Sequence, residues 1–145
     1  KEQKLNEVLW HVLNYISLRT TKKVKFVCNF PATPVIIKLS AALFEWVIEN
    51  LCKNAIDAMS GRGRIIITMH ELTNDVIIEV ADTGKGIAKN RFKSVFVPGY
   101  TTKQRGWGLG LSLARRIVED YHNGKIFVKN SEIGKGTTFR IELKK

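Results

Sequence analysis

Hydrophobic residues near the start of the chain recur at steps of three and four positions. The residues with this spacing are Leu5, Val8, Leu9, Val12, Leu13 and Ile16. Such spacing puts apolar side chains on one face of a helix, so it predicts an amphipathic helix that ends between Arg19 and Lys23. We interpret residues 1–20 as the C-terminal helix and linker of a preceding helical domain, and residues 21–145 as a separate domain.

The rest of the chain alternates between patterns typical of strands and of helices. The predicted elements, in chain order, are strands at 24–30 and 35–38, a helix at 41–59, strands at 64–71 and 76–81, a helix at 108–121, and strands at 124–130 and 137–143. Ser40 is a suitable N-cap for the helix at 41–59. Helices separated by pairs of strands predict a two-layer α/β (α+β) sandwich, in which three main helices cover one face of a mixed, largely antiparallel sheet.

One connection is too long to be a simple loop. It runs from Asp82 to Trp107, is rich in glycine, lysine and threonine, and contains a short apolar cluster around Phe92 and Phe96. Connections of this length are usually functional lids or disordered segments. We therefore expect a flexible lid beside a binding site.

Length and composition predict one soluble globular unit. The 145 residues are 44% hydrophobic and 26% charged, which is the range of ordinary globular domains. No apolar run approaches the roughly eighteen residues of a membrane span, and the N-terminus lacks the pattern of a signal peptide. We expect a cytoplasmic location, and we expect Cys28 and Cys52 to be buried, reduced thiols.

The formal net charge of +11 raises the possibility of nucleic-acid binding. The basic residues are scattered, however, and no helix-turn-helix, zinc-finger spacing or aromatic-rich ribonucleoprotein strand accompanies them. We therefore expect no nucleic acid as a partner, because attraction to nucleotide phosphates explains part of the same charge.

Polar residues lie on one side of the predicted helix at 41–59. At about 100° per residue, Asn50, Asn54 and Asp57 project from the side opposite Ile48 and Leu51. An asparagine oxygen is a neutral hard ligand that suits Mg²⁺, which takes few protein ligands and fills its octahedron with water and phosphate oxygens. The alternative interpretation is a solvated polar face.

An aspartate and two glycines follow the predicted strand at 76–81. Asp82 accepts hydrogen bonds only, so it can select the exocyclic amino group of adenine over the carbonyl of guanine. Gly84 and Gly86 allow a ligand to approach the backbone without a Cβ in the way. The alternative is an ordinary glycine-rich turn.

Two further glycine motifs lie later in the chain. Gly106, Gly108 and Gly110 open a predicted helix, where free backbone N–H groups and the helix dipole favour an anion such as phosphate. The motif matches neither a Rossmann fingerprint nor a Walker A loop. In the turn at 134–139, the Thr137 hydroxyl can reach a bound base, although this segment alone is also an ordinary hairpin turn.

In this order and at these separations, the four clusters resemble the N box, G1 box, G2 box and terminal Gly-Thr motif of the Bergerat-fold ATPases. The resemblance covers essentially the whole chain, and residues 95–98 and 100–103 resemble the F box and lid of sensor histidine kinases. It implies that Asn54 binds Mg²⁺ and that Asp82 holds adenine. The implied catalytic residues are Asn50, Asn54 and Lys103. The implied ATP-binding residues are Asn50, Lys53, Asn54, Asp57, Asp82, Gly84, Gly86, Ile87, Tyr100, Thr101, Thr102, Lys103, Gly106, Gly108, Leu109, Gly110, Leu111 and Thr137.

The residue at position 50 separates a kinase from a hydrolase within this superfamily. Hydrolysing members generally carry a glutamate four residues before the Mg²⁺-binding asparagine, and this chain has Asn50 there. An amide is not a usable general base, so the site favours phosphoryl transfer, which depends on alignment and charge neutralisation. Lys103 and Arg105 in the lid are expected to approach the γ-phosphate. The alternatives are a non-catalytic nucleotide-sensing domain and another Bergerat-fold ATPase.

The resemblance also implies the partners. His11, His70 and His122 lack the sequence context of a phosphoacceptor, so the acceptor histidine is expected on a separate dimerisation-phosphoacceptor domain of the same protein, to which residues 1–20 would belong. A response regulator is expected downstream. We expect a homodimeric parent protein, free or membrane-bound, and a monomeric fragment. Phe92 and Phe96 are core anchors or a docking patch for the phosphoacceptor domain, and we favour docking for Phe96.

Overall fold

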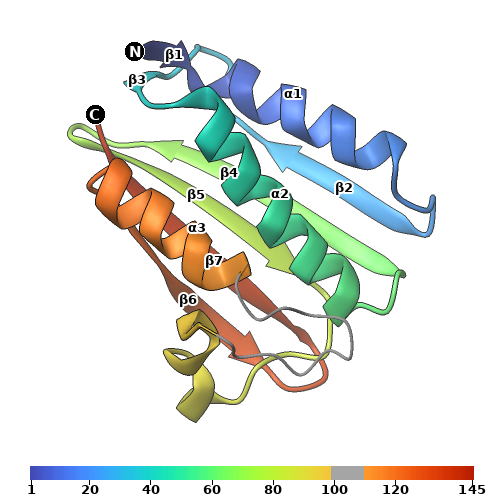
Figure 1. Cartoon of the computed structure of the whole chain (residues 1–145). Helices are drawn as coiled ribbons and strands as arrows, with labels where there is room; N and C mark the ends of the chain where they lie inside the picture. The colour runs from blue at the N-terminus through green and yellow to red at the C-terminus, as the bar shows by residue number, and fades with distance from the viewer. Residues whose placement is uncertain (99–109) are drawn as a thin grey trace.

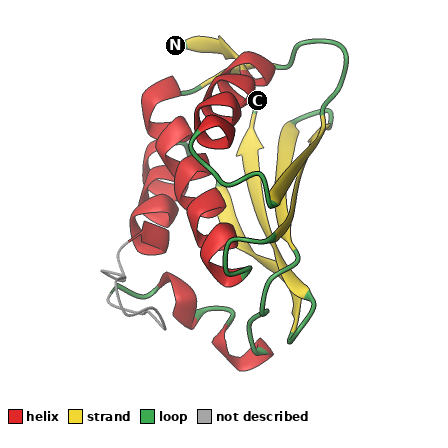
Figure 2. Ribbon diagram, turned by 90° about the vertical axis from the view of Figure 1, so that its right-hand side faces the viewer, coloured by secondary structure: helices red, strands yellow, loops and turns green. Residues whose placement is uncertain are grey.

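The computed structural model describes residues 1–98 and 110–145. Five strands form one sheet in the order β2 (Val24–Asn29), β4 (Gly63–Glu71), β5 (Asp75–Asp82), β7 (Gly136–Lys144) and β6 (Lys125–Glu132). The β2–β4 pair is parallel and the other pairs are antiparallel. Helices α1 (Leu5–Leu18), α2 (Ala41–Ala58) and α3 (Gly110–Arg116) lie on one face of this sheet (Figures 1 and 2). The predicted two-layer sandwich is confirmed.

The core lies between the helices and one face of the sheet. Along β7, buried residues alternate with half-buried ones, as expected for a strand with one face in a core. The side chains that β4 contributes are Ile65, Ile67 and Met69, and α2 contributes Phe44 and Ile48, which are fully buried. The helical spacing of apolar residues in α2 and their alternation in the strands predict these buried positions.

Helix α1 packs into this same core. Leu5 and Leu9 are fully buried, and the amide of Asn6 joins the helix to the segment after β2. Its Oδ1 accepts a hydrogen bond from the N–H of Val35 at 2.8 Å, and its Nδ2 donates to the carbonyl of Pro31 at 3.0 Å. The assignment of residues 1–20 to a preceding domain remains a prediction.

The small strands near the N-terminus differ from the prediction. Strand β3 (Ile36–Lys38) pairs antiparallel with β1 (Glu2–Lys4) in a separate two-stranded sheet, and the sequence gave no sign of β1. Three residues are too few for alternation to be recognised, and their pairing depends on a contact between distant parts of the chain.

The last helix is less regular than the predicted helix at 108–121. Residues 108 and 109 lie outside the described residues, and the α-helix α3 changes at Ile117 into a π-helical turn, η3 (Ile117–Tyr121). His122 follows this turn and connects it to α2. Its Nδ1 lies 2.9 Å from the carbonyl of Ile117, and its Nε2 lies 3.1 Å from the backbone N–H of Ser40. Because Nε2 accepts from that N–H, the proton of the ring is on Nδ1.

Most of the apolar cluster at 92–97 packs into the core, although Val97 is exposed. Two short 3₁₀ turns, η1 (Lys89–Arg91) and η2 (Ser94–Phe96), lie in this segment, and η2 packs against α3. Phe96 is only 6% exposed, its ring meets that of Phe139 edge-to-face at 6.0 Å, and the guanidinium of Arg115 lies 5.6 Å from its centroid. Our preference for docking through Phe96 was therefore wrong, because burial leaves this ring unavailable. Phe92 is half-buried against the same core.

No helix within residues 1–98 and 110–145 is long and apolar enough to cross a membrane.

Candidate functional site

Asp82 ends strand β5, and its carboxylate is held by two backbone N–H groups. Oδ1 accepts from Gly84 at 2.8 Å and from Thr137 at 3.3 Å. Both of these hydrogen bonds are made by Oδ1, and none of the hydrogen bonds seen among the described residues uses Oδ2. Burial raises the pKa of Asp82, and the hydrogen bonds from Gly84 and Thr137 lower it without cancelling that rise. The carboxylate is thus held by the backbone through Oδ1 and is partly desolvated.

The glycine loop after Asp82 is clamped between two parts of the protein. A Cβ on Gly84 would lie 2.7 Å from the backbone carbonyl of Ala58, at the end of α2. Gly86 has a φ of +82°, and a Cβ there would overlap the carbonyl oxygen of Glu132 in β6. Both glycines are therefore needed for close packing against protein backbone, which fixes the loop beside Asp82.

Ser131 in β6 joins this loop to the strand that carries Thr137. Its Oγ lies 2.7 Å from the N–H of Ile87, 3.0 Å from the carbonyl of Gly136 and 2.7 Å from the hydroxyl of Thr137. Sequence reasoning missed this residue. The only available signal was its position opposite Thr137 in the final hairpin, where residues 131 and 137 pair.

The polar face of α2 meets the beginning of α3. The Nδ2 of Asn50 donates to the carbonyl of Trp46 at 2.9 Å, and a Cβ on Gly110 would lie 2.8 Å from the Oδ1 of Asn50. Asn54, one turn further along, is half-buried on the same side, and Asp57 is exposed. The first turn of α3 therefore lies directly over the amide of Asn50.

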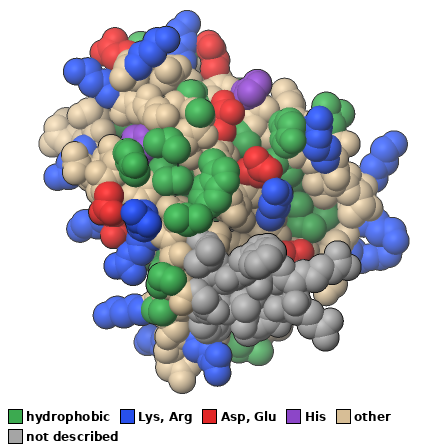
Figure 3. Space-filling view, in the orientation of Figure 1, with side chains coloured by type: hydrophobic (Ala, Val, Ile, Leu, Met, Phe, Trp, Pro, Cys, Tyr) green, Lys and Arg blue, Asp and Glu red, His purple; other side chains and the backbone are tan. Residues whose placement is uncertain are grey.

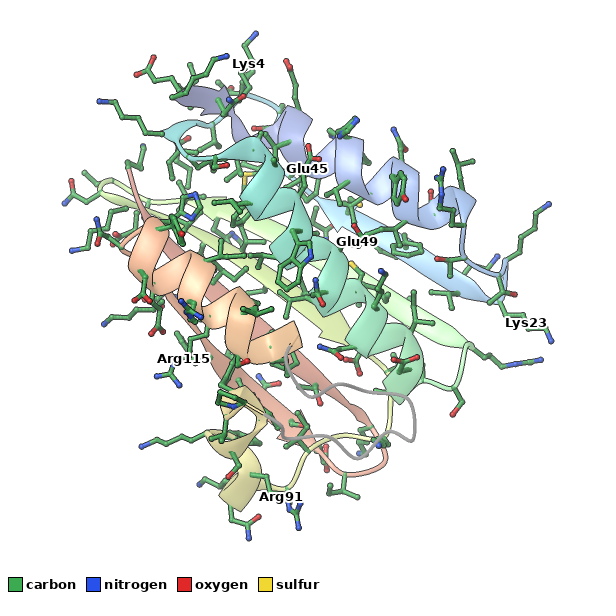
Figure 4. All side chains as sticks on the ribbon, viewed as in Figure 1. Lys4, Lys23, Glu45, Glu49, Arg91 and Arg115 are labelled. Atoms are coloured by element: carbon green, nitrogen blue, oxygen red, sulfur yellow. The ribbon has the colours of Figure 1, made fainter. Side chains whose placement is uncertain are left out.

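Lys53 and Glu49 form an ion pair on the outside of α2. Lys53 Nζ lies 2.9 Å from Glu49 Oε2, and the lysine side chain is 64% exposed. Figure 4 shows Glu49 and, one turn earlier, Glu45 on α2. Glu45 contacts His11 of α1 at 2.9 Å. Glu49 is thus held by a cation on its own helix.

The structure brings most of the described candidates to one end of the molecule. The C-terminal half of α2, the end of β5 and the start of α3 meet there (Figure 1). Leu111 packs against the core next to Gly110. The candidates that lie outside the described residues are Tyr100, Thr101, Thr102, Lys103, Arg105, Gly106, Trp107, Gly108 and Leu109, and with them the lid.

The donor set of α2 fits a magnesium ion that is bound mainly by phosphate and water. Within residues 1–98 and 110–145, no three His, Cys, Asp or Glu side chains are grouped as a metal site. Mg²⁺ needs only one or two protein ligands when a nucleotide supplies the others. An amide oxygen from Asn54 meets that requirement, whereas a structural zinc site would need several ligands.

The surroundings of the site are basic. Residues 83–98 and 110–118 contain six lysines and arginines and no aspartate or glutamate; the six are Lys85, Lys89, Arg91, Lys93, Arg115 and Arg116. Figure 3 shows lysine and arginine side chains around the lower edge of this face, and Figure 4 places Arg91 and Arg115 there. Positive charge at the rim of a site raises the local concentration of anions such as polyphosphates.

Comparison with known proteins identifies the class. The chain belongs to the family of histidine kinase-, DNA gyrase B- and HSP90-like ATPases, whose family model matches residues 40–145. Within that family it is similar to catalytic domains of sensor histidine kinases. The catalytic domain of histidine kinase ThkA superposes with a TM-score of 0.90 at 32% identity, over 100% of this chain and 95% of that one.

Two sequence relatives give the same result. The chain is 38% identical over 142 residues to the sensor histidine kinase ZraS of Salmonella typhi, a match that covers 96% of this chain and 30% of that protein. It is 44% identical over 98 residues to sporulation kinase E of Bacillus subtilis (strain 168), covering 67% of this chain and 13% of that protein. The chain therefore spans less than a third of the curated relatives it matches.

Proposed function

We propose that this chain binds Mg-ATP and presents the γ-phosphoryl group to a histidine on the dimerisation-phosphoacceptor domain of the same protein, as part of two-component signal transduction. The observation that carries this proposal is the amide at position 50. Asn50 is oriented by Trp46 and covered by Gly110, and it cannot deprotonate water. The carboxylate next to it in the sequence, Glu49, is paired with Lys53.

The described residues supply complementary parts of a nucleotide site. Oδ2 of Asp82, the oxygen that is not used by Gly84 and Thr137, is suited to the exocyclic amino group of adenine. Asn54 is proposed as the protein ligand of Mg²⁺, which would neutralise charge on the phosphates. Ile87, whose N–H is bound by Ser131, is proposed as a neighbour of the base, and the basic rim favours the triphosphate. Lys103 stays the proposed lid residue at the γ-phosphate.

The proposed partners lie in the rest of the parent protein and downstream of it. Two of the three histidines of this chain contact other parts of the domain, since His122 bridges two elements and His11 contacts Glu45. A solved structure of ThkA contains the response regulator TrrA, and its kinase chain superposes with a TM-score of 0.87 at 30% identity over 100% of this chain and 41% of that one. This similarity supports a response regulator as the final acceptor.

Phosphoryl transfer tests the proposal directly. The chain is mixed with radiolabelled Mg-ATP and the phosphoacceptor domain of its parent protein, and acid-labile, base-stable phosphate on that domain is measured. Transfer by the wild type, and loss of transfer in Asn54→Ala and Asp82→Asn, is the expected result. Asn14→Ala, on the exposed side of α1, is the matched control and should transfer normally.

Hydrolysis in place of transfer would contradict the proposal. Free phosphate is measured in the same reactions, with Glu49→Gln as an additional variant. Release of phosphate to water that depends on Glu49, without label on the acceptor domain, would show that the chain is a hydrolase with a displaced base.

A further inference from the structure

Ser131 connects three segments that surround Asp82. It lies in β6, receives the N–H of Ile87 from the glycine loop at 2.7 Å, and contacts both Gly136 and Thr137 at the start of β7. Thr137 in turn donates its backbone N–H to the Oδ1 of Asp82. One hydroxyl group therefore ties the loop after Asp82 to the strand that holds the carboxylate.

The number of protons limits the directions that these hydrogen bonds can take. A serine hydroxyl has one proton and two lone pairs. The carbonyl of Gly136 can only accept, whereas either hydroxyl can donate in the contact between Ser131 and Thr137, so we assign the Ser131 proton to Gly136 at 3.0 Å. One lone pair of Ser131 then receives the N–H of Ile87, and the other receives the hydroxyl proton of Thr137 across 2.7 Å. Ser131 is saturated, and Thr137 Oγ1 has only acceptor capacity left.

This arrangement determines what the site can bind. With its proton committed to Ser131, Thr137 cannot donate to a ligand, and Asp82 uses Oδ1 for Gly84 and Thr137. Both side chains can therefore only accept further hydrogen bonds. A ligand group that donates is favoured there, and a carbonyl oxygen is disfavoured by two unpaired acceptors.

We propose that Ser131 is a positioning residue that determines purine specificity, by holding Asp82 and Thr137 so that the site presents only hydrogen-bond acceptors. The proposal rests on the proposed nucleotide-binding function. Ser131 itself does not contact the nucleotide, because all of its hydrogen-bonding capacity is used within the protein. It acts on the exocyclic position of the base, where adenine carries an amino group and hypoxanthine a carbonyl.

The test compares the affinities of Mg-ADP and Mg-IDP, measured by calorimetry on the 145-residue chain. The wild type should prefer ADP, and Ser131→Ala should reduce the ratio of the two affinities about tenfold while leaving the IDP affinity nearly unchanged. Ser131→Thr, which keeps the hydroxyl, should restore the preference. Ser17→Ala, on the exposed side of α1, is the control.

The outcomes separate this inference from the proposed function. Equal weakening of ADP and IDP binding in Ser131→Ala, or an unchanged ratio, would refute the specificity role, since a purely structural residue acts on both nucleotides alike. A wild type that binds neither nucleotide would refute the proposed function itself. Should Ser131→Ala not fold, Ser131→Cys keeps the shape with a weaker donor and should show a smaller fall in the same ratio.

Discussion

Asp82 is the residue at which burial opposes the role that we propose for it. Burial raises its pKa, so the folded protein holds this carboxylate in its charged form at a cost in stability. The N–H groups of Gly84 and Thr137 offset part of that cost, and both bind the same oxygen, Oδ1. Groups with perturbed pKa values and a definite partner set are concentrated at functional sites.

Asp82→Asn should therefore separate stability from binding. The amide oxygen can still accept from Gly84 and Thr137, and the charge that burial disfavours is gone, so we expect unfolding free energy at pH 7.5 to be unchanged or up to about 1 kcal/mol higher. ADP binding should be lost, because an amide can place its NH₂ group against the adenine amino group. Urea unfolding and calorimetry measure the two effects.

The sign of the pH dependence follows from the direction of the shift. Because the pKa of Asp82 is higher in the folded chain than in the unfolded chain, the folded chain keeps this proton to higher pH. Wild-type stability relative to Asp82→Asn should fall as pH rises from the ordinary aspartate pKa through the raised one, and then stay constant. If the stability of the wild type relative to Asp82→Asn instead rose over this pH range, the fold would stabilise the charged carboxylate.

Gly84→Ala should disturb the loop by steric overlap alone. The new Cβ would lie 2.7 Å from the Ala58 carbonyl, so either the loop or the end of α2 must move, at about 1–3 kcal/mol and with weaker ADP binding. Gly134→Ala is the control, since its Cβ meets nothing within 4 Å and only its φ of +84° opposes the change. Normal ADP affinity in Gly84→Ala would mean that the loop position is unimportant.

The sequence made Asp82 and Gly84 candidate site residues but not Ser131, and the reason is physical. A carboxylate followed by two glycines at a strand end is unusual locally, so it can be recognised. The role of Ser131 arises from a partner 44 residues away, Ile87, and from the register of the last hairpin. A serine in a strand has no local feature that distinguishes it.

At the scale of elements, periodicity predicted the helices and hairpins that form the site. The amphipathic pattern at 41–59 corresponds to α2, and the Ser40 Oγ accepts from the N–H of Leu43 at 3.3 Å, as expected of an N-cap. The predicted strands at 64–71 and 76–81 correspond to β4 and β5 within one residue at each end. The π turn η3 was not predictable, because His122 stabilises it through a contact with distant Ser40.

That bridge predicts a stabilising role for His122. In His122→Ala, the N–H of Ser40 and the carbonyl of Ile117 lose their partner, and the ring contact with Phe44 at 6.3 Å is lost. We expect a loss of about 2–3 kcal/mol in urea unfolding. His11→Ala, whose side chain is 75% exposed, should cost at most about 1 kcal/mol. Equal effects of the two changes would show that the bridge contributes nothing.

At the scale of the molecule, the position of α1 bears on where the catalytic domain begins. The family model begins at residue 40, yet the ThkA catalytic domain superposes on the whole chain. Sequence could not decide the boundary, since an amphipathic helix has the same pattern whether its apolar face packs against this domain or another. In this structure Leu5 and Leu9 are fully buried, so the apolar face of α1 packs against the core of this domain.

Removal of residues 1–20 should therefore unfold the remaining chain. The truncated chain 21–145 would expose the part of the core that α1 covers and would lose the Asn6 hydrogen bonds to Pro31 and Val35. We expect no cooperative thermal transition by circular dichroism. Within the full chain, Leu9→Ala should cost about 2–5 kcal/mol, because it leaves a cavity in the core. Leu18→Ala, at a side chain that is 82% exposed, should change stability by less than about 0.5 kcal/mol. If chain 21–145 melted cooperatively at the temperature of the full chain and bound ADP equally well, α1 would be an independent element, and the boundary at residue 20 would be correct.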